Sequence, residues 1–231
     1  MIIEIAKNSP SARGMFINKN ELPRHINTEE PLFRSTYLYP DEVKDELDKL
    51  GTIKDYFGVR DIDNMIIDID KKDNSDEYTL EQLKEVVDIL YSFDVQDDSM
   101  QPFYSGTGYH LIVSNKVFGF EASEELPMIV RATMTKLFPN IDNSIYMRSG
   151  IYRVPHTINK KSELYKIPIH MDEVFKEKAE YIKLLAQGPR LDYKYKPLTG
   201  NGECADELVK ADNKIYKMQS VSEPNKIVPC V

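Results

Sequence analysis

Met65-Ile66-Ile67-Asp68-Ile69-Asp70 is an apolar run that ends in two closely spaced carboxylates. Its composition is typical of a buried β-strand, and side chains alternate between the two faces of a strand. Asp68 and Asp70 are therefore expected on one face, with Ile67 and Ile69 on the other. Neighbouring carboxylates repel each other, and Mg²⁺ or Mn²⁺ relieves that repulsion because both ions prefer hard oxygen ligands. The alternative is a half-exposed strand with a polar face, since an isolated Asp-x-Asp is a weak motif.

A glycine turn between two apolar segments forms the second motif. Ser105-Gly106-Thr107-Gly108 lies within 103–113 and is expected to join two strands. Glycines there permit positive φ and let backbone amides approach an anion. His110 follows two residues later and could donate a hydrogen bond to a phosphate, although a satisfied core histidine is the alternative. The dinucleotide-binding fingerprint is excluded, because Leu111 stands where its third glycine is needed.

A third carboxylate and a basic segment come later in the chain. Asp142 follows a predicted helix and is expected at the mouth of another short strand, where it could join the first two carboxylates. Its alternative role is an Asx turn. From Arg148 to Lys166 there are two arginines and three lysines against the single acid Glu163, in a chain of net charge −8. This reversal indicates an anion-binding surface, or else a solvated basic loop.

The remaining pattern predicts an α/β (α+β) chain with one catalytic domain over 1–188 and a tail or linker over 189–231. The segment 8–21 is expected to be loop, and 164–169 to form a hairpin with the strand at 151–154. Thr79 is the expected N-cap of a helix whose apolar stripe contains Leu80, Leu83 and Leu90. The further strands are expected at 2–6 and 31–39, and the helices at 41–50, 79–93, 123–138, 172–186 and 204–212.

The order of these motifs resembles the archaeo-eukaryotic primase superfamily, above all its primase-polymerases from phages, plasmids and mobile or CRISPR-associated loci. The resemblance covers about residues 30–170 and is specific because three ordered motifs match together. It is carried by Asp68-x-Asp70, by Ser105-Gly-Thr-Gly-Tyr-His110, and by Asp142 followed by Arg153-Val-Pro-His-Thr157-x-Asn159-Lys160. His156-Thr157 departs from the Gly-Ser of many relatives but keeps a hydroxyl.

The resemblance implies a two-lobed fold with an antiparallel sheet like that of RNA-recognition domains and packed helices. It implies a template-dependent nucleotidyltransferase that makes primers de novo from NTPs or dNTPs and extends them on single-stranded DNA. Two Mn²⁺ or Mg²⁺ ions and no organic cofactor are implied, held by Asp68, Asp70 and Asp142. The implied triphosphate contacts are Ser105, Gly106, Gly108, His110, Arg153, Thr157, Asn159, Lys160 and Arg34. The implied template contacts are Arg148, Lys161 and Lys166.

Other functions compatible with the same residues are a gap-filling repair polymerase, a two-metal nuclease and a non-catalytic nucleotide-binding module. No signal peptide or membrane span is recognisable, and two distant cysteines suit a reducing compartment, so a cytoplasmic protein without a membrane partner is expected. Val228-Pro229-Cys230-Val231 resembles the start of the iron-sulfur domain of primase large subunits. An accessory iron-sulfur or helicase module is therefore an expected partner.

Overall fold

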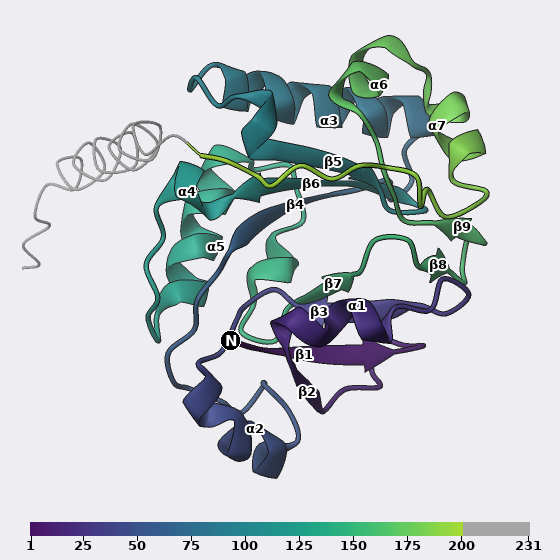
Figure 1. Cartoon of the computed structure of the whole chain (residues 1–231). Coiled ribbons are helices and arrows are strands. Elements are labelled where there is room, and N and C mark those ends of the chain that lie inside the picture. Colours follow the sequence, from purple (N-terminus) through teal and green to yellow (C-terminus); the bar gives the residue numbers. More distant parts are fainter. Residues whose placement is uncertain (201–231) are drawn as a thin grey trace, which may run out of the picture.

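The computed structural model describes residues 1–200, which form a mixed α/β structure with two antiparallel four-stranded sheets (Figure 1). The first sheet has the order β2-β1-β3-β7, formed by Met15–Asn18, Ile2–Lys7, Leu32–Ser35 and Ile151–Arg153. The second has the order β10-β5-β6-β4, formed by Ile167–Pro168, Met100–Tyr104, Gly108–Ser114 and Asn64–Asp70. A separate ribbon pairs β8, Ile158–Asn159, with β9, Leu164–Tyr165.

Helices cover the outer face of the second sheet and leave its inner face turned toward the first sheet (Figure 1). The α-helices are α1 (Leu22–His25), α2 (Lys44–Leu50), α3 (Asp76–Tyr91), α4 (Asn115–Phe118), α5 (Leu126–Leu137), α6 (Met171–Lys176) and α7 (Ala179–Leu185). The short 3₁₀ helices are η1 (Lys19–Glu21), η2 (Asp41–Val43), η3 (Asp97–Ser99) and η4 (Asn143–Tyr146). Within the described part of the chain, no helix has the length and apolar character needed to cross a bilayer.

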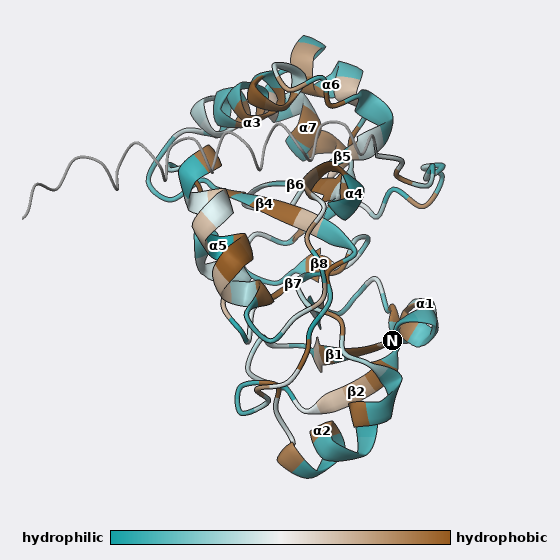
Figure 2. Cartoon of the chain, turned by 90° about the vertical axis from the view of Figure 1, so that its left-hand side faces the viewer, coloured by the Kyte–Doolittle hydropathy of each residue, from teal (hydrophilic) through white to brown (hydrophobic). Residues whose placement is uncertain are grey.

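β4 confirms the alternation expected from its sequence. Ile67 and Ile69 are buried, and the predicted apolar stripe of α3 is buried with them in the main core. Most of β4 is apolar, and it becomes polar at the end that carries Asp68 and Asp70 (Figure 2). The hydrophobic side of this strand therefore anchors the sheet on α3, while the two carboxylates are left on the inner face.

The first third of the chain contains more regular structure than expected. The segment 8–21 is not all loop, because Met15–Asn18 pairs with β1 and η1 follows it. Helix α3 also begins earlier than expected, with Ser75 as N-cap accepting a hydrogen bond from the Tyr78 N–H at 3.1 Å. Thr79 is inside the helix, where its hydroxyl donates to the Ser75 carbonyl and so cannot cap.

In the second half of the chain, the strand pairing differs from the expected hairpin. The strand 151–154 pairs with β3 of the first sheet and not with 164–169. The segment 164–169 is divided, because β9 pairs with β8 and β10 pairs with β5. The expected helix 172–186 is two helices, α6 and α7, since the backbone is extended at Glu177 and Lys178.

Residues 189–200 run along the second sheet (Figure 1) and pack on its inner face. The Tyr193 hydroxyl donates to Gln101 Oε1 at 2.9 Å, and Tyr195 stacks on Phe103 with ring centroids 6.3 Å apart. The first part of the predicted tail therefore belongs to the packed structure. The helix expected at 204–212 and the motif Val228–Val231 lie outside the described residues.

Candidate active site

Three carboxylates meet at one end of β4. The pairing of β4 with β6 places Asp68 opposite His110 and Asp70 opposite Gly108. Asp142 lies at the free edge of β4, where its backbone N–H donates to the Asp68 carbonyl at 3.3 Å. The short strand expected after Asp142 is instead the 3₁₀ helix η4, which Asp142 caps by accepting the Ser144 N–H at 2.8 Å. Asp142 therefore forms an Asx-type turn and also lies next to Asp68, so the two expected alternatives occur together.

The carboxylates have different electrostatic surroundings. The pKa of Asp70 is raised by partial burial and by the negative charges of Asp68 and Asp142. Burial also raises the pKa of Asp68, but its contact with His110 and the charges of Lys166 and Arg153 outweigh that effect and lower the pKa overall. Asp70 is therefore the group whose negative charge is least compensated, and it would gain most from a nearby cation.

The donor chemistry suits a hard divalent cation, although the ligand set is not closed. Within residues 1–200, no three His, Cys, Asp or Glu side chains are gathered tightly enough to hold a metal ion. Asp68 lies 3.3 Å from His110 Nε2, and Asp142 is bound to the Ser144 amide. Carboxylate oxygens are the donors that Mg²⁺ and Mn²⁺ prefer, so Asp68, Asp70 and Asp142 match these ions in chemistry, while the first and third are engaged with His110 and the Ser144 amide.

His110 is held between an acid and a base. Its Nε2 faces Asp68 Oδ1 at 3.3 Å, and its Nδ1 lies 2.8 Å from Lys166 Nζ. Burial, followed by the charge of Lys166, lowers the pKa of His110 and favours the neutral ring. Lys166 also donates to the Arg153 carbonyl at 2.7 Å. With Lys166 donating to Nδ1, the ring proton is placed on Nε2, directed at Asp68.

Lys166 has a different role from the expected template contact. Its side chain is 0% exposed and lies 5.1 Å from the ring centroids of both Phe103 and Tyr152. Burial lowers its pKa well below the usual range. A fully buried amine cannot lie along a nucleic-acid backbone, so that prediction is wrong. Lys166 instead contacts His110 from the protein interior, through the hydrogen bond to its Nδ1.

The glycine turn is packed so closely that its shape is fixed. Gly106 has φ of 93°, and a Cβ there would lie 2.9 Å from Asn159 Cβ. A Cβ on Gly108 would lie 2.4 Å from the Ile69 carbonyl oxygen. Ser105 accepts the Gly108 N–H at 3.1 Å through its hydroxyl and the Arg153 guanidinium at 2.9 Å through its carbonyl. The buried Nε of Arg153 has no hydrogen-bond partner among the described residues, so it has a donor to offer a ligand.

Gly108→Ala should therefore destabilise the fold by about 2 kcal/mol or more, because the new methyl group collides with the backbone of β4. Urea unfolding followed by circular dichroism measures this loss. Gly188→Ala is the matched control, since a Cβ there meets nothing within 4 Å. Equal midpoints for the two variants would show that the turn is not constrained as described.

A cavity of about 520 Å³ opens beside Asp70 and the glycine turn. Gly106 and Thr107 line it together with several lysines. Two of these, Lys71 and Lys183, pair with Asp76 at 2.9 and 2.8 Å. The other two, Lys72 and Lys161, form no ion pair within residues 1–200 and lie at the cavity wall. Positive side chains around a hollow of this size suit phosphate groups.

Lys72 is a cavity residue that the sequence reasoning missed. The signal was its position two residues after Asp70, at the start of a polar turn. Lys161, expected on the template, lies at this cavity instead. Asn159 supports the cavity from behind, because its Oδ1 accepts the Lys161 N–H at 3.1 Å and its Cβ contacts the turn near Gly106.

Other predicted contacts lie elsewhere. Thr157 is fully buried and donates its hydroxyl to the Val154 carbonyl at 2.8 Å, so the prediction that it contacts a triphosphate is wrong. Lys160 is exposed and reaches Asn8 Oδ1 at 3.4 Å.

The remaining two arginines each lie against an aromatic ring. Arg34 lies 3.8 Å from Asp63 and 5.5 Å from the Tyr152 ring. Arg148 lies 4.8 Å from the Phe57 ring centroid and outside the 520 Å³ cavity.

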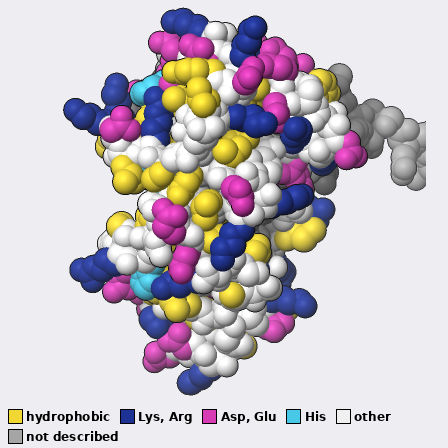
Figure 3. Space-filling view, turned by 90° about the vertical axis from the view of Figure 1, so that its right-hand side faces the viewer, with side chains coloured by type: hydrophobic (Ala, Val, Ile, Leu, Met, Phe, Trp, Pro, Cys, Tyr) yellow, Lys and Arg dark blue, Asp and Glu magenta, His cyan; other side chains and the backbone are white. Residues whose placement is uncertain are grey.

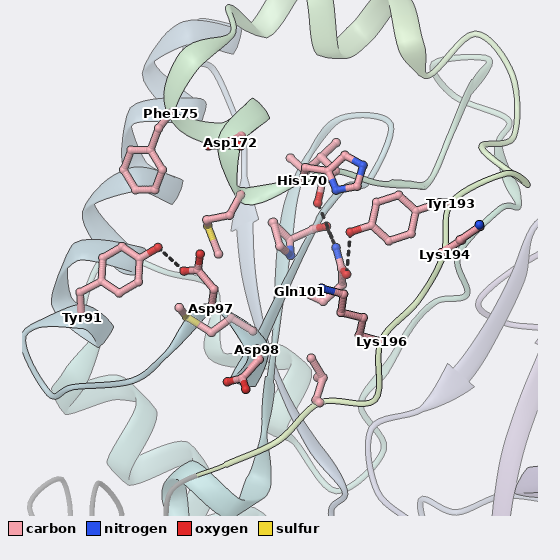
Figure 4. Close-up of a pocket in the computed structure, with 15 residues that line it drawn as sticks. Tyr91, Asp97, Asp98, Gln101, His170, Asp172, Phe175, Tyr193, Lys194 and Lys196 are labelled. Atoms are coloured by element: carbon pink, nitrogen blue, oxygen red, sulfur yellow. Dashed lines mark hydrogen bonds between the residues drawn. The ribbon is translucent and has the colours of Figure 1, made fainter.

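A second cavity, of about 580 Å³, lies at the opposite end of β5 (Figure 4). Tyr91 and Asp97 are hydrogen-bonded on one wall, and Tyr193 and Gln101 on the other. None of the site residues predicted from the sequence lines this cavity. It is therefore separate from the carboxylate site.

Comparison of the sequence with models of known protein families finds no match, and comparison with curated proteins finds none either. The function is therefore proposed from the residues and their geometry.

Proposed function

We propose that this chain is the catalytic domain of a primase-polymerase of the archaeo-eukaryotic type, with its two-lobed fold. The observation that carries the proposal is Asp70, whose pKa is raised by burial and by Asp68 and Asp142, at the wall of a lysine-lined cavity. Phosphoryl transfer to a 3'-hydroxyl needs negative ligands for cations and positive groups for phosphates within one site. The mixed α/β fold with antiparallel sheets is compatible with this class.

The chain's own residues supply binding and orientation. Two bound Mg²⁺ or Mn²⁺ ions would activate the attacking hydroxyl and neutralise the transferred phosphoryl group. Asp68, Asp70 and Asp142 provide the oxygen donors for that purpose. The turn at Gly106 and the side chains of Lys72 and Lys161 receive the triphosphate.

His110 lies between Asp68 and the supporting Lys166, with its Nε2–H directed at Asp68. A shift of this hydrogen bond from Asp68 to a phosphate oxygen is the movement we assign to nucleotide binding. The buried, unpaired Nε of Arg153 can serve the same anion.

Initiation should depend on the cavity lysines more than extension does. Starting a strand requires a second nucleotide to be held through its own triphosphate, without help from a primer duplex. Lys72→Gln and Lys161→Gln are expected to lower dinucleotide formation about tenfold and primer extension only a few-fold. Both losses should shrink at higher salt.

Lys160→Gln is the matched control, because Lys160 neighbours Lys161 but points to Asn8. Gel analysis of unprimed and primed reactions measures both activities. Equal loss in both reactions would assign these lysines to the incoming nucleotide alone, and extension without any unprimed product would favour a gap-filling polymerase.

The proposed function itself is tested by primer extension on single-stranded DNA with Mn²⁺, comparing the native chain with Asp70→Asn. Template-directed addition by the native chain only is the expected result. Shortening of the labelled DNA without any addition would identify a nuclease, and nucleotide binding without either reaction would identify a non-catalytic module.

A further inference from the structure

A groove of about 630 Å³ lies outside the site described above, between α5 and the segment that follows η4. Its walls include Met128, Arg131 and Lys136 of α5 and the consecutive residues Tyr146, Met147 and Arg148. The helix α5 and η4 are packed against each other, so these walls are formed by two elements in direct contact. Both elements are part of the folded domain, and the groove is preformed.

The charge of the groove is opposite to that of the chain. Among residues 1–200, the lining includes Arg131 and Arg148 and no carboxylate, whereas the protein carries a net charge of −8. Arg131 and Arg148 form no ion pair with any residue of the described range. Glu124 and Glu125, at the start of α5, are outside the lining. By contrast, positive and negative side chains are mixed on the face that Figure 3 shows. A groove whose described lining carries arginines and no acid, in an acidic protein, is complementary to an anion.

Apolar side chains accompany the arginines. Met128 is 68% exposed and Met147 is 47% exposed. Phe57 is 64% exposed, and the guanidinium of Arg148 lies 4.8 Å from its ring centroid. Exposed aromatic and apolar surface beside arginines is the combination that binds unpaired bases and their phosphates. A polyanion without bases would leave this apolar surface in water.

The groove and the carboxylate site are linked by one chain segment, η4 and its N-cap Asp142. Asp142 caps η4, and the chain leaves η4 directly into Met147 and Arg148 on the groove wall. The Asp142 N–H is bonded to the Asp68 carbonyl. The groove therefore includes the last residue of η4, the 3₁₀ helix whose N-cap is the third carboxylate.

We propose that this groove binds the single-stranded DNA template. Its phosphates contact Arg131 and Arg148, and its bases lie against Phe57, Met128 and Met147. That the bound strand is a template rests on the proposed function. That the groove binds single-stranded DNA is argued from the groove residues alone. Of the residues expected to contact the template, only Arg148 lines this groove. The proposal adds Arg131 and the apolar side chains to it.

The test measures binding of a fluorescein-labelled oligothymidylate by fluorescence anisotropy, without nucleotide or metal. The double variant Arg131→Gln/Arg148→Gln should bind about tenfold more weakly. The slope of log affinity against log salt should fall by about 1.4, which is two single-strand phosphate contacts. Phe57→Ala should weaken binding about fivefold or more through lost stacking. All three side chains are exposed, and thermal melting checks that each variant is folded.

The control variant is Lys176→Gln/Lys178→Gln, which removes the same charge on α6 and just before α7. It should bind the oligonucleotide like the native chain. Groove variants that also bind like the native chain would overturn the proposal. Arginine-dependent binding of polyglutamate or of phosphatidylserine vesicles in preference to DNA would overturn it as well, and would assign the groove to an acidic protein or a lipid surface.

Asp70→Asn separates this inference from the proposed function. That variant should bind the oligonucleotide normally. Groove-dependent binding in a chain that never adds nucleotides would refute the polymerase and leave the groove standing. If the native chain adds nucleotides but the groove variants bind DNA normally, the polymerase is supported and the groove assignment is refuted.

Discussion

Replacing Asp70 with Asn should lower nucleotide addition by about a thousandfold or more, in Mg²⁺ and in Mn²⁺ alike. Asp70 is the carboxylate with the least compensated charge, so its loss removes the strongest attraction for a cation at the site. Incorporation of labelled nucleotide on a primed template measures the effect. Asp73→Asn, which neutralises an exposed carboxylate in the next turn, should remain active. Robust extension by Asp70→Asn would refute the carboxylate assignment.

The same substitution has an expected effect on stability, and its sign depends on pH. Burial, Asp68 and Asp142 raise the pKa of Asp70 in the folded state. Protonated Asp70 therefore stabilises the folded state below its unfolded-state pKa of about 3.9. This contribution to the free energy of unfolding is lost as pH rises through the folded-state pKa. At pH 7 and without metal, Asp70→Asn should melt at the same or a slightly higher temperature than the native chain. Thermal melts from pH 4 to 7 test this, and a lower melting temperature at pH 7 would contradict the electrostatic account.

Replacing Lys166 with Met should lower nucleotide addition about as strongly as replacing His110 with Ala, by about tenfold to a hundredfold each. Lys166 determines which nitrogen of His110 carries the proton, so its removal leaves the ring free to turn its acceptor toward the anion. Methionine keeps most of the side chain's volume against Phe103 and Tyr152, which limits the loss of packing.

The two effects should be non-additive, because both substitutions remove one function. The double variant should then be only slightly worse than either single variant, measured as nucleotide KM and kcat in a double-mutant cycle. Oligonucleotide affinity should stay unchanged, which separates this role from general destabilisation. Multiplicative losses in the double variant would show that Lys166 acts independently of His110, for example as packing alone.

Local patterns in the sequence were sufficient to predict β4, the burial of its isoleucines and the shared face of Asp68 and Asp70, because alternation depends only on neighbouring residues. They also predicted the strand–turn–strand around Gly106. The position of His110 against Asp68 could not be derived, since it depends on the register between two strands that are distant in sequence.

Lys166 and Thr157 show where the sequence reading failed. Both belong to a basic segment that was expected to face a ligand, and both are fully buried. Lys166 is buried beside β10, which pairs with β5. Thr157 is buried in the turn after Val154, where its hydroxyl donates to the Val154 carbonyl. These are long-range or conformational choices that charge and composition do not encode. Lys72 was missed for the opposite reason, because an exposed turn lysine has no pattern that distinguishes it until the cavity is formed.

The most direct test of the central claim uses single-stranded DNA, Mn²⁺ and labelled nucleotides without any primer. Short products whose composition follows the template are expected from the native chain and absent with Asp70→Asn. Unprimed and primed reactions that both yield no product, by a folded chain that binds the DNA, would contradict the assignment of this site to nucleotide transfer.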